Sequence, residues 1–257
     1  MKTIILAGGL GTRLSEETVL KPKPMVKIGL QPILWHIMKI YSSYGFNDFI
    51  VLLGYKGYMI KEYFYNYFLH SNDVTINLKE KKTTFHNNKT EPWTITLLDT
   101  GEDTMTGSRI KKAKNFIQDS TFMLTYGDGL CDLNIPDQLS FHKRHGGLIT
   151  MTSVQPDGKF GSFEEGENSL VNKFIEKPKG DGSWINGGFF ICEKEIMDYI
   201  DEGNDIVFEN STLKKLANDK KMFSYRHSGF WKCMDTIRDK NELNSLWNKN
   251  KAPWKLW

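Results

Sequence analysis

Three glycines follow directly after the first apolar run of the chain, and they constrain its fold more than any other feature. The run Lys2-Thr3-Ile4-Ile5-Leu6 is rich in β-branched residues, which is typical of a buried strand. Gly8, Gly9 and Gly11 come immediately after it. Glycine loses more backbone freedom on folding than any other residue, so such a cluster indicates a loop where a ligand approaches bare backbone N–H groups. A phosphate is the ligand that such a loop suits.

Two better-known glycine loops do not fit this segment. The dinucleotide-binding pattern G-x-G-x-x-G matches from Gly9 but fails at Leu14, where its third glycine should stand. The Walker A pattern fails because Arg13 and Leu14 stand where Gly-Lys-Ser/Thr should. For the glycines alone, an ordinary turn beside a solvated basic loop remains an alternative.

Two cations favour the phosphate interpretation. Arg13 offers a planar fork that matches phosphate oxygens. Lys23 is a point charge between Pro22 and Pro24, on backbone biased toward extended geometry. Together they suit a triphosphate whose leaving pyrophosphate has to be neutralised.

The order of the predicted elements indicates an α/β fold. A helix opened by Pro32 and closed near Gly45 is followed by a strand at 49–53, so the chain starts with a βαβ unit and a parallel sheet. Residues 79–90 are rich in lysine and asparagine, with Asn87-Asn88 as a turn signal, and predict a projecting hairpin or loop. The remaining pattern predicts helices at 59–69, 110–117, 137–145, 193–200 and 208–218, and strands at 74–78, 94–99, 121–126, 148–154, 170–175, 188–192 and 222–227.

An acid between two glycines ends one of these strands. Gly127-Asp128-Gly129 follows the strand at 121–126. Open α/β sheets bind ligands at the carboxyl ends of their strands, and glycine neighbours leave room for a cation and phosphates. We therefore expect Asp128 to be a metal ligand.

Composition argues against several classes of protein. In 257 residues, 25% are charged and the formal net charge is +3, with lysines interleaved among acids, so no nucleic-acid footprint is predicted. The sequence contains no apolar run of about 18 residues and no signal-peptide pattern, which favours a cytoplasmic protein without a membrane partner. Cys131, Cys192 and Cys233 lack C-x-x-C spacing and predict neither a disulfide framework nor a zinc site.

The motifs resemble those of the nucleotidyltransferases that join a nucleoside triphosphate to a sugar 1-phosphate, and within that family the bacterial glucose-1-phosphate cytidylyltransferases. The blocks that carry this resemblance run nearly from end to end: Gly8 to Arg13, Pro22 to Pro24, Gly54 to Tyr58, Tyr126 to Gly129, Glu176 to Gly180, Ile185 to Phe189, Gly229 to Trp231 and Met234 to Thr236.

The resemblance implies a fold and a reaction. The expected fold is a Rossmann-like open, mostly parallel sheet, of the nucleotidyltransferase type, with helices on both faces and a small antiparallel sugar-binding part. One domain would span 1–257, with nucleotide bound by about 1–135 and sugar phosphate by about 136–257, which also carries a C-terminal helix and tail. The implied reaction converts CTP and α-D-glucose 1-phosphate to CDP-glucose and diphosphate with Mg²⁺, in a symmetric homo-oligomer such as a hexamer.

The resemblance also assigns roles to residues. Catalysis falls to Arg13, Lys23 and Asp128, and Mg²⁺ to Asp128 and Asp235. Sugar phosphate would contact Gly161, Glu176, Lys177 and Asn186. The nucleotide would contact Leu6, Ala7, Gly8, Gly9, Leu10, Gly11, Thr12, Arg13, Lys23, Thr104, Arg109 and Gly127.

Several alternatives remain open from the residues. The same chemistry could use UTP, dTTP or another hexose 1-phosphate, and a nucleotide-sensing subunit without chemistry would keep the same pocket. Thr104 or Thr106 could simply cap a helix, and Glu176-Lys177 could be a charged turn. Asp235 precedes Thr236 and Asp239, a capping pattern for the last helix. The tryptophan-rich tail is expected to pack on the body or on another subunit.

Overall fold

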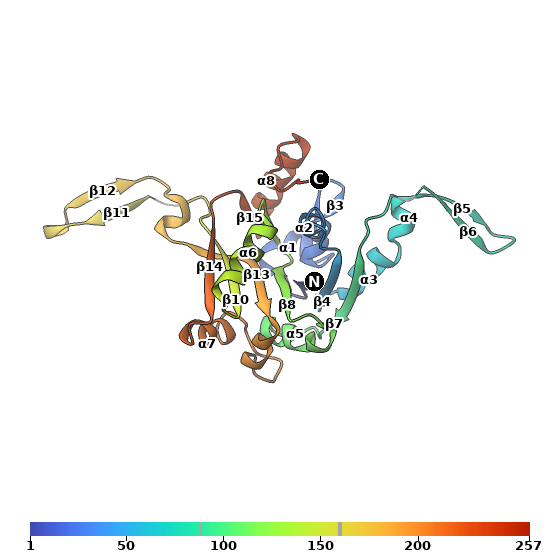
Figure 1. Ribbon diagram of the computed structural model, residues 1–257. Coiled ribbons are helices and arrows are strands. Elements are labelled where there is room, and N and C mark those ends of the chain that lie inside the picture. The colour runs from blue at the N-terminus through green and yellow to red at the C-terminus, as the bar shows by residue number, and fades with distance from the viewer. Residues whose placement is uncertain (88, 159–160) are drawn as a thin grey trace.

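Figure 1 shows the protein as a computed structural model, which describes residues 1–87, 89–158 and 161–257. Its centre is a seven-stranded sheet with the order β14-β10-β13-β8-β1-β4-β7. Only β13 runs antiparallel to its neighbours β8 and β10; the other pairs, β1 with β4 and β8, β4 with β7, and β10 with β14, are parallel. The expected open, mostly parallel sheet is confirmed. The strands are β1 (Lys2–Ala7), β4 (Asp48–Leu53), β7 (Thr94–Asp99), β8 (Thr121–Tyr126), β10 (Ile149–Val154), β13 (Ile185–Glu193) and β14 (Met222–His227).

Helices cover both faces of this sheet, as expected (Figure 1). Successive strand side chains point to opposite faces, so Ile4 and Ile5 of β1 belong to two different cores. The core that contains Ile5 is closed by α2 (Ile33–Ser42), α6 (Ile135–His145) and α8 (Ile237–Asn248). The core that contains Ile4 is closed by α5 (Thr106–Lys112) and α7 (Thr212–Asn218).

Smaller elements decorate the edges of the sheet. Two short antiparallel pairs lie close to the body: β2 (Lys27–Ile28) with β3 (Gln31–Pro32), and β9 (Gly129–Cys131) with β15 (Trp231–Cys233). The remaining α-helices are α1 (Ser15–Thr18), α3 (Gly57–Tyr65) and α4 (Tyr67–Ser71). Short 3₁₀ segments cover Thr12–Leu14, Lys23–Met25, Lys114–Phe116, Glu167–Ser169, Lys179–Gly182 and Lys194–Tyr199.

Two hairpin arms extend from opposite sides of the body (Figure 1). One arm consists of β5 (Asp73–Asn77) and β6 (Lys82–His86), and the other of β11 (Ser162–Glu165) and β12 (Val171–Ile175). The first confirms a projecting hairpin in the 79–90 segment, although its turn falls at 78–81. The predicted turn at Asn87-Asn88 includes Asn88, which lies outside the described residues.

Four predicted helices differ from the structure. The helix predicted at 110–117 is instead α5, which ends at Lys112, followed by the 3₁₀ segment Lys114–Phe116. The helix predicted at 59–69 is broken at Asn66, which has non-helical backbone angles, into α3 and α4. The helix predicted at 193–200 is a 3₁₀ segment. The helix predicted from 208 begins only at Thr212, because the Phe208 N–H donates to Thr106 Oγ1 of α5 at 2.9 Å and so ties this backbone to a neighbouring element.

The C-terminal tail packs on the body, as one of the two expected outcomes. Trp254 is fully buried and stacks on Phe230 and Trp247, while its indole N–H donates to His36. Ahead of the tail, Thr236 caps α8 with Asp239 in the predicted capping box. In the part of the chain that the structure describes, no helix has the length and apolar character needed to cross a bilayer.

Candidate active site

The glycine loop is shaped by a buried arginine. Arg109 Nη2 donates to the carbonyls of Gly8 at 3.0 Å and Glu102 at 2.9 Å, and Nη1 donates to the Leu53 carbonyl at 2.9 Å. A Cβ on Gly8 would lie 2.4 Å from Nη1, so this approach requires glycine. Gly11 has φ +67°, a left-handed conformation that also favours glycine. The donors of Arg109 are therefore directed at protein oxygens, and the side chain holds the loop in place.

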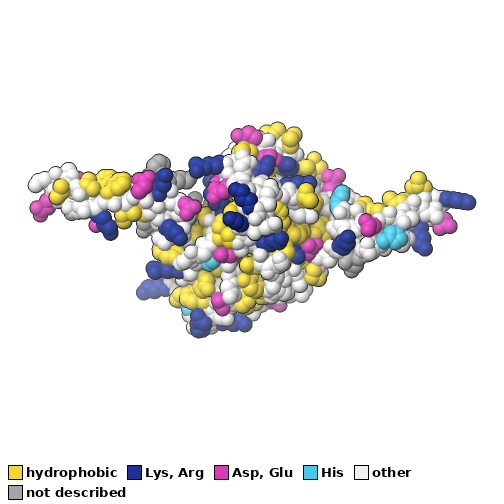
Figure 2. Space-filling view, turned by 90° about the horizontal axis from the view of Figure 1, so that it is seen from above, with side chains coloured by type: hydrophobic (Ala, Val, Ile, Leu, Met, Phe, Trp, Pro, Cys, Tyr) yellow, Lys and Arg dark blue, Asp and Glu magenta, His cyan; other side chains and the backbone are white. Residues whose placement is uncertain are grey.

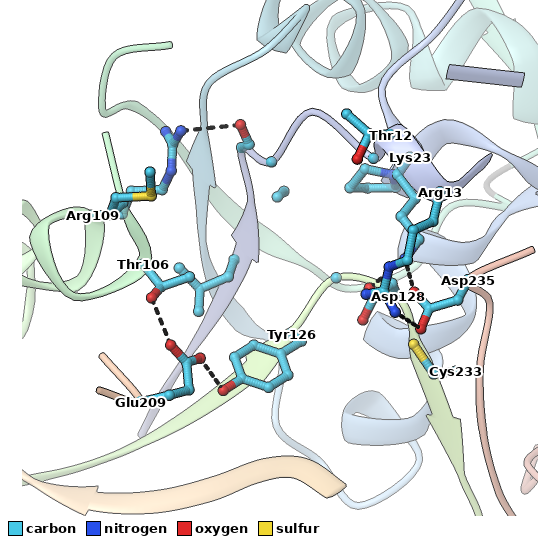
Figure 3. Close-up of a pocket in the computed structure, with 18 of the residues that line it drawn as sticks. Thr12, Arg13, Lys23, Thr106, Arg109, Tyr126, Asp128, Glu209, Cys233 and Asp235 are labelled. Atoms are coloured by element: carbon cyan, nitrogen blue, oxygen red, sulfur yellow. Dashed lines mark hydrogen bonds and ion pairs between the residues drawn. The ribbon is translucent and has the colours of Figure 1, made fainter. Parts of the chain in front are cut away.

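Two distant acids meet around one lysine. Lys23 Nζ lies 2.6 Å from Asp128 Oδ2 and 2.6 Å from Asp235 Oδ1, and Arg13 Nη1 lies 2.7 Å from Asp235 Oδ2 (Figure 3). Asp128 follows β8 and Asp235 follows β15. The two segments are joined because β9 pairs with β15 and because the Met234 N–H donates to the Asp128 carbonyl at 2.9 Å. The pairing of two short strands thus brings together residues that are far apart in sequence.

This cluster keeps its charges. Burial is the largest single effect on Lys23 and would lower its pKa, but the charge of Asp128 and the hydrogen bonds to Asp128 and Asp235 together outweigh burial and raise the pKa above the usual value. Burial would likewise raise the pKa of Asp235, yet the hydrogen bond and charge of Lys23, with the charge of Arg13, lower it. Both shifts favour the charged forms, so Lys23 is an ammonium and Asp235 a carboxylate near neutral pH.

One cavity of about 540 Å³ connects the glycine loop with this cluster. It brings together most of the residues predicted to bind nucleotide or metal, together with Asn186 from the predicted sugar site. These lining residues are Leu6, Ala7, Gly8, Gly9, Gly11, Thr12, Arg13, Lys23, Thr104, Arg109, Gly127, Asp128, Asn186 and Asp235.

Four predicted contacts lie elsewhere. Leu10 is exposed and does not line the cavity. Gly161, Glu176 and Lys177 lie at the base of the β11–β12 arm, where they are exposed and also outside the cavity lining. The Lys177 ammonium is 3.8 Å from its neighbour Glu176, so the two charges face each other at the surface.

The capping alternatives near Arg109 are wrong. Met105 occupies the N-cap of α5 without a side-chain hydrogen bond. Thr104 instead donates from Oγ1 to the Thr100 carbonyl at 2.6 Å, and Thr106 donates to Glu209 at 2.9 Å. Both threonines line the cavity.

The prediction from sequence missed several groups in the cavity wall. Tyr126, Glu209, Trp231 and Cys233 line it, as does Thr106. From the sequence, Tyr126 is placed at a strand end and in the Tyr126 to Gly129 block without a role, and Glu209 is placed only in a helix. Cys233 does have a sequence signal, because it stands two residues before Asp235.

The acids fit a hard divalent cation. Ligand atoms of Asp128, Cys233 and Asp235 all lie within 4.8 Å of one another, and the ammonium of Lys23 bridges the two carboxylates. This contact shows that the acid pair binds positive charge inside the cavity. Mg²⁺ prefers oxygen ligands and takes one or two carboxylates together with waters and substrate phosphates, so Asp128 and Asp235 suffice without the thiol.

A mostly parallel sheet with a glycine loop after its first strand, and with an acid pair beside that loop, is the arrangement of a nucleotide-binding α/β protein. The nucleotidyl transferase family model matches residues 2–250, and the chain belongs to this family. It is 52% identical to the glucose-1-phosphate cytidylyltransferase of Salmonella typhi over 259 aligned positions, with full coverage of both chains. It is 45% identical, again over both full lengths, to the probable glucose-1-phosphate cytidylyltransferase of Bacillus subtilis.

Solved structures share the fold at lower identity. HddC from Yersinia pseudotuberculosis is 24% identical, with a TM-score of 0.67, over 96% of this chain and 99% of that one. A UDP-glucose pyrophosphorylase bound to UDP-glucose is 18% identical, with a TM-score of 0.68, over 97% of this chain and 98% of that one. These matches support the fold assignment alone.

Proposed function

We propose that the protein is a glucose-1-phosphate cytidylyltransferase, which converts CTP and α-D-glucose 1-phosphate to CDP-glucose and diphosphate. The full-length identity of 52% to a relative of that name supports the choice of substrates. The observation that carries the chemistry is the single cavity shared by the glycine loop, Lys23 and the acids Asp128 and Asp235.

The reaction needs no protein nucleophile. A phosphate oxygen of glucose 1-phosphate attacks the α-phosphorus of CTP, a new P–O bond forms, and the bond to the β-phosphate breaks with the electron pair leaving on pyrophosphate. Catalysis then consists of alignment and charge neutralisation. Asp128 and Asp235 would hold Mg²⁺, which when bound supplies positive charge beside the phosphates.

Each cationic side chain of the cavity has a role in this proposed reaction. The glycine amides and Arg13 bind the pyrophosphate that leaves, and Arg13 is exposed enough to reach it, with 73% of its side chain accessible. Lys23 lies between the two acids, so it exchanges carboxylate partners for phosphate oxygens as substrate enters. Arg109 keeps the Gly8 carbonyl fixed and so preserves the shape of the loop. We retain Glu176, Lys177 and Gly161 as proposed sugar-phosphate contacts, reached by movement of the β11–β12 arm.

A panel of four nucleoside triphosphates tests this proposal. CTP, UTP, dTTP and GTP are each incubated with glucose 1-phosphate and Mg²⁺, and pyrophosphate release is followed. CTP is expected to give the highest kcat/KM, and release should require the sugar phosphate. Preference for UTP or dTTP would replace the nucleotide assignment, preference for another hexose 1-phosphate would replace the sugar, and binding without release in every mixture would indicate a nucleotide-sensing subunit.

We further propose that the protein is a homo-oligomer, with a hexamer as the expected form. The arms support this, because they carry apolar side chains away from the body (Figure 2). Phe163, Leu170 and Phe174 on the β11–β12 arm are each more than half exposed, and a two-stranded hairpin cannot bury them on itself. The free state of all three cysteines fits the cytoplasm, which we propose as the location.

A further inference from the structure

A carboxylate lies across the cavity from the phosphate-binding groups. Glu209 belongs to the turn that precedes α7, and its side chain lines the cavity on the side away from Lys23, Asp128 and Asp235 (Figure 3). The mechanism above leaves it without a role.

Two hydroxyl groups fix this carboxylate. The Tyr126 hydroxyl donates to Glu209 Oε1, and Thr106 Oγ1 donates to Oε2 at 2.9 Å. Thr106 Oγ1 already accepts from the Phe208 N–H, and the Tyr126 oxygen accepts from Asn186 Nδ2 at 3.2 Å. Each hydroxyl therefore has its proton available for Glu209. Burial, together with the charge of Glu209, raises the pKa of Tyr126, which keeps this donor protonated.

The carboxylate has acceptor capacity left over. An ionised carboxylate offers about four acceptor directions, and the two hydroxyls use one on each oxygen. Within the described residues, no salt bridge to Glu209 is formed. A carboxylate without a cation repels phosphate but binds substrate hydroxyl groups well. Two adjacent oxygens, each with a free acceptor direction, match two adjacent hydroxyl groups.

We propose that Glu209, held by Tyr126 and Thr106, is a specificity-determining residue that accepts hydrogen bonds from a vicinal diol of the substrate. This inference rests on the proposed function, whose substrates carry such diols on the ribose of CTP and on the hexose. The negative charge of Glu209 and the positive charges of Arg13 and Lys23 then orient the substrates, with phosphates toward one wall and hydroxyls toward the other.

The test is a cycle that combines a substitution in the enzyme with the deletion of one hydroxyl group from the substrate, each change being made alone and then together. Glu209→Gln keeps the size of the side chain but removes the charge and one acceptor oxygen. We expect kcat/KM to fall about 10- to 100-fold, chiefly through KM, because hydrogen bonds to a charged group are lost. Wild type and variant are then compared on CTP against 2′-deoxy-CTP, and on glucose 1-phosphate against 3-deoxyglucose 1-phosphate.

The diol is identified by the substrate change whose effect is not additive with that of Glu209→Gln. If Glu209 binds the ribose, deleting the 2′-hydroxyl lowers kcat/KM of the wild type by a larger factor than kcat/KM of Glu209→Gln. If Glu209 binds the hexose, the 3-deoxy sugar produces this difference between the two enzymes instead. Glu202→Gln is the matched control, since Glu202 is an exposed acid of the preceding loop and lies outside the cavity lining. Tyr126→Phe should give a smaller loss with the same pattern, because it loosens the carboxylate without removing it.

Additive losses for both analogues would overturn the inference. Calorimetric binding of the same four ligands to both enzymes gives the same cycle without turnover, so it remains informative if the wild type prefers another nucleotide or performs no chemistry. In those cases the nucleotide panel rejects the proposed function. The coupling between Glu209 and a substrate hydroxyl is still measured, by comparing the preferred nucleotide with its 2′-deoxy form.

Discussion

At the scale of single residues, the cavity is organised by Lys23. Its ammonium contacts both Asp128 and Asp235 and so reduces the repulsion between the two carboxylates. A cation between two acids holds them close together, and in the proposed mechanism it stays beside the phosphates once substrate is bound. In that mechanism Lys23 links the proposed metal site to the proposed nucleotide site.

Replacing Lys23 should abolish most turnover without unfolding the protein. For Lys23→Ala we expect kcat to fall at least about 100-fold, because transition-state charge loses a preorganised partner. Steady-state pyrophosphate release measures the change, and circular dichroism checks the fold. Lys21→Ala is the control: Lys21 pairs with Glu17 outside the cavity, and its loss should leave kcat within about twofold. Near-wild-type kcat for Lys23→Ala would remove Lys23 from the mechanism. Asp128→Ala is expected to behave like Lys23→Ala.

Arg109 should act through the loop it supports. Arg109→Lys keeps the charge but cannot reach the carbonyls of Gly8, Leu53 and Glu102 together. We expect the free energy of unfolding to fall by about 3 kcal/mol and KM for the nucleotide to rise. Denaturant titration and initial rates measure both effects, and Arg144→Lys on an exposed helix surface serves as the control. Unchanged stability and unchanged KM together would show that the loop holds its shape without Arg109.

Residues with their own local pattern were predictable from the sequence, and residues that act through tertiary contacts were not. The glycines, Arg13, Lys23 and Asp128 stand in recognisable motifs, and the structure places them in one cavity. Glu209 has no such motif, because its role depends on Tyr126 and Thr106, which reach it from two other elements. Glu176 and Lys177 of the arm show the opposite situation. They stand in a recognisable motif, but a sequence motif does not determine how far its residues lie from a cavity.

At the scale of elements, the spacing of hydrophobic residues determined which strands and helices could be predicted. The seven sheet strands follow apolar or alternating runs, and each was predicted within one residue of its bounds, apart from β13, which begins three residues early at Ile185. Helix type was harder, since the 3₁₀ segment Lys194–Tyr199 has an apolar pattern similar to that of an α-helix. Strand β11 was missed because Ser162–Glu165 is short, polar and exposed, and pairs only with β12.

The packing of α2 against the C-terminal tail predicts a pH dependence. Burial lowers the pKa of His36 from 6.5 to about 4, so His36 is neutral in the folded protein. Between these values the unfolded chain binds the extra proton more readily, so stability from this site is full above about pH 6.5 and is lost as pH falls toward 4. Between pH 7 and pH 5 the loss should be about 2 kcal/mol.

Comparison with a variant isolates this contribution. Denaturant unfolding of wild type and His36→Gln at both pH values measures it, and the wild type should show the steeper loss. His86→Gln, on an exposed strand, should behave like the wild type. Parallel pH dependence in wild type and His36→Gln would contradict the assignment of a neutral buried histidine.

At the scale of the whole molecule, the arms set the expected assembly. The β11–β12 arm carries Glu164, Glu165 and Glu167 against a single Lys173, whereas the β5–β6 arm carries Lys79, Lys81 and Lys82 against Asp73 and Glu80. The arms point to opposite sides of one body, so their net charges, which are opposite in sign, can meet only between copies (Figure 2).

Loss of apolar arm surface should therefore weaken the oligomer. Phe163 and Phe174 face each other in the β11–β12 register and are 59% and 63% exposed. Phe174→Ser should shift the mass measured by light scattering toward smaller species at micromolar concentration, while Lys173→Ser on the same strand should have little effect. A monomeric wild type would contradict the proposed assembly.

The central claim is that the glycine loop and the two distant acids act on one metal-bound nucleotide. Binding of Mn²⁺ in place of Mg²⁺, followed by electron paramagnetic resonance with and without CTP, tests it most directly. We predict one tightly bound Mn²⁺ per chain in the presence of CTP, and loss of that binding in both Asp128→Asn and Asp235→Asn. Unaltered, CTP-dependent Mn²⁺ binding in both variants would contradict the account.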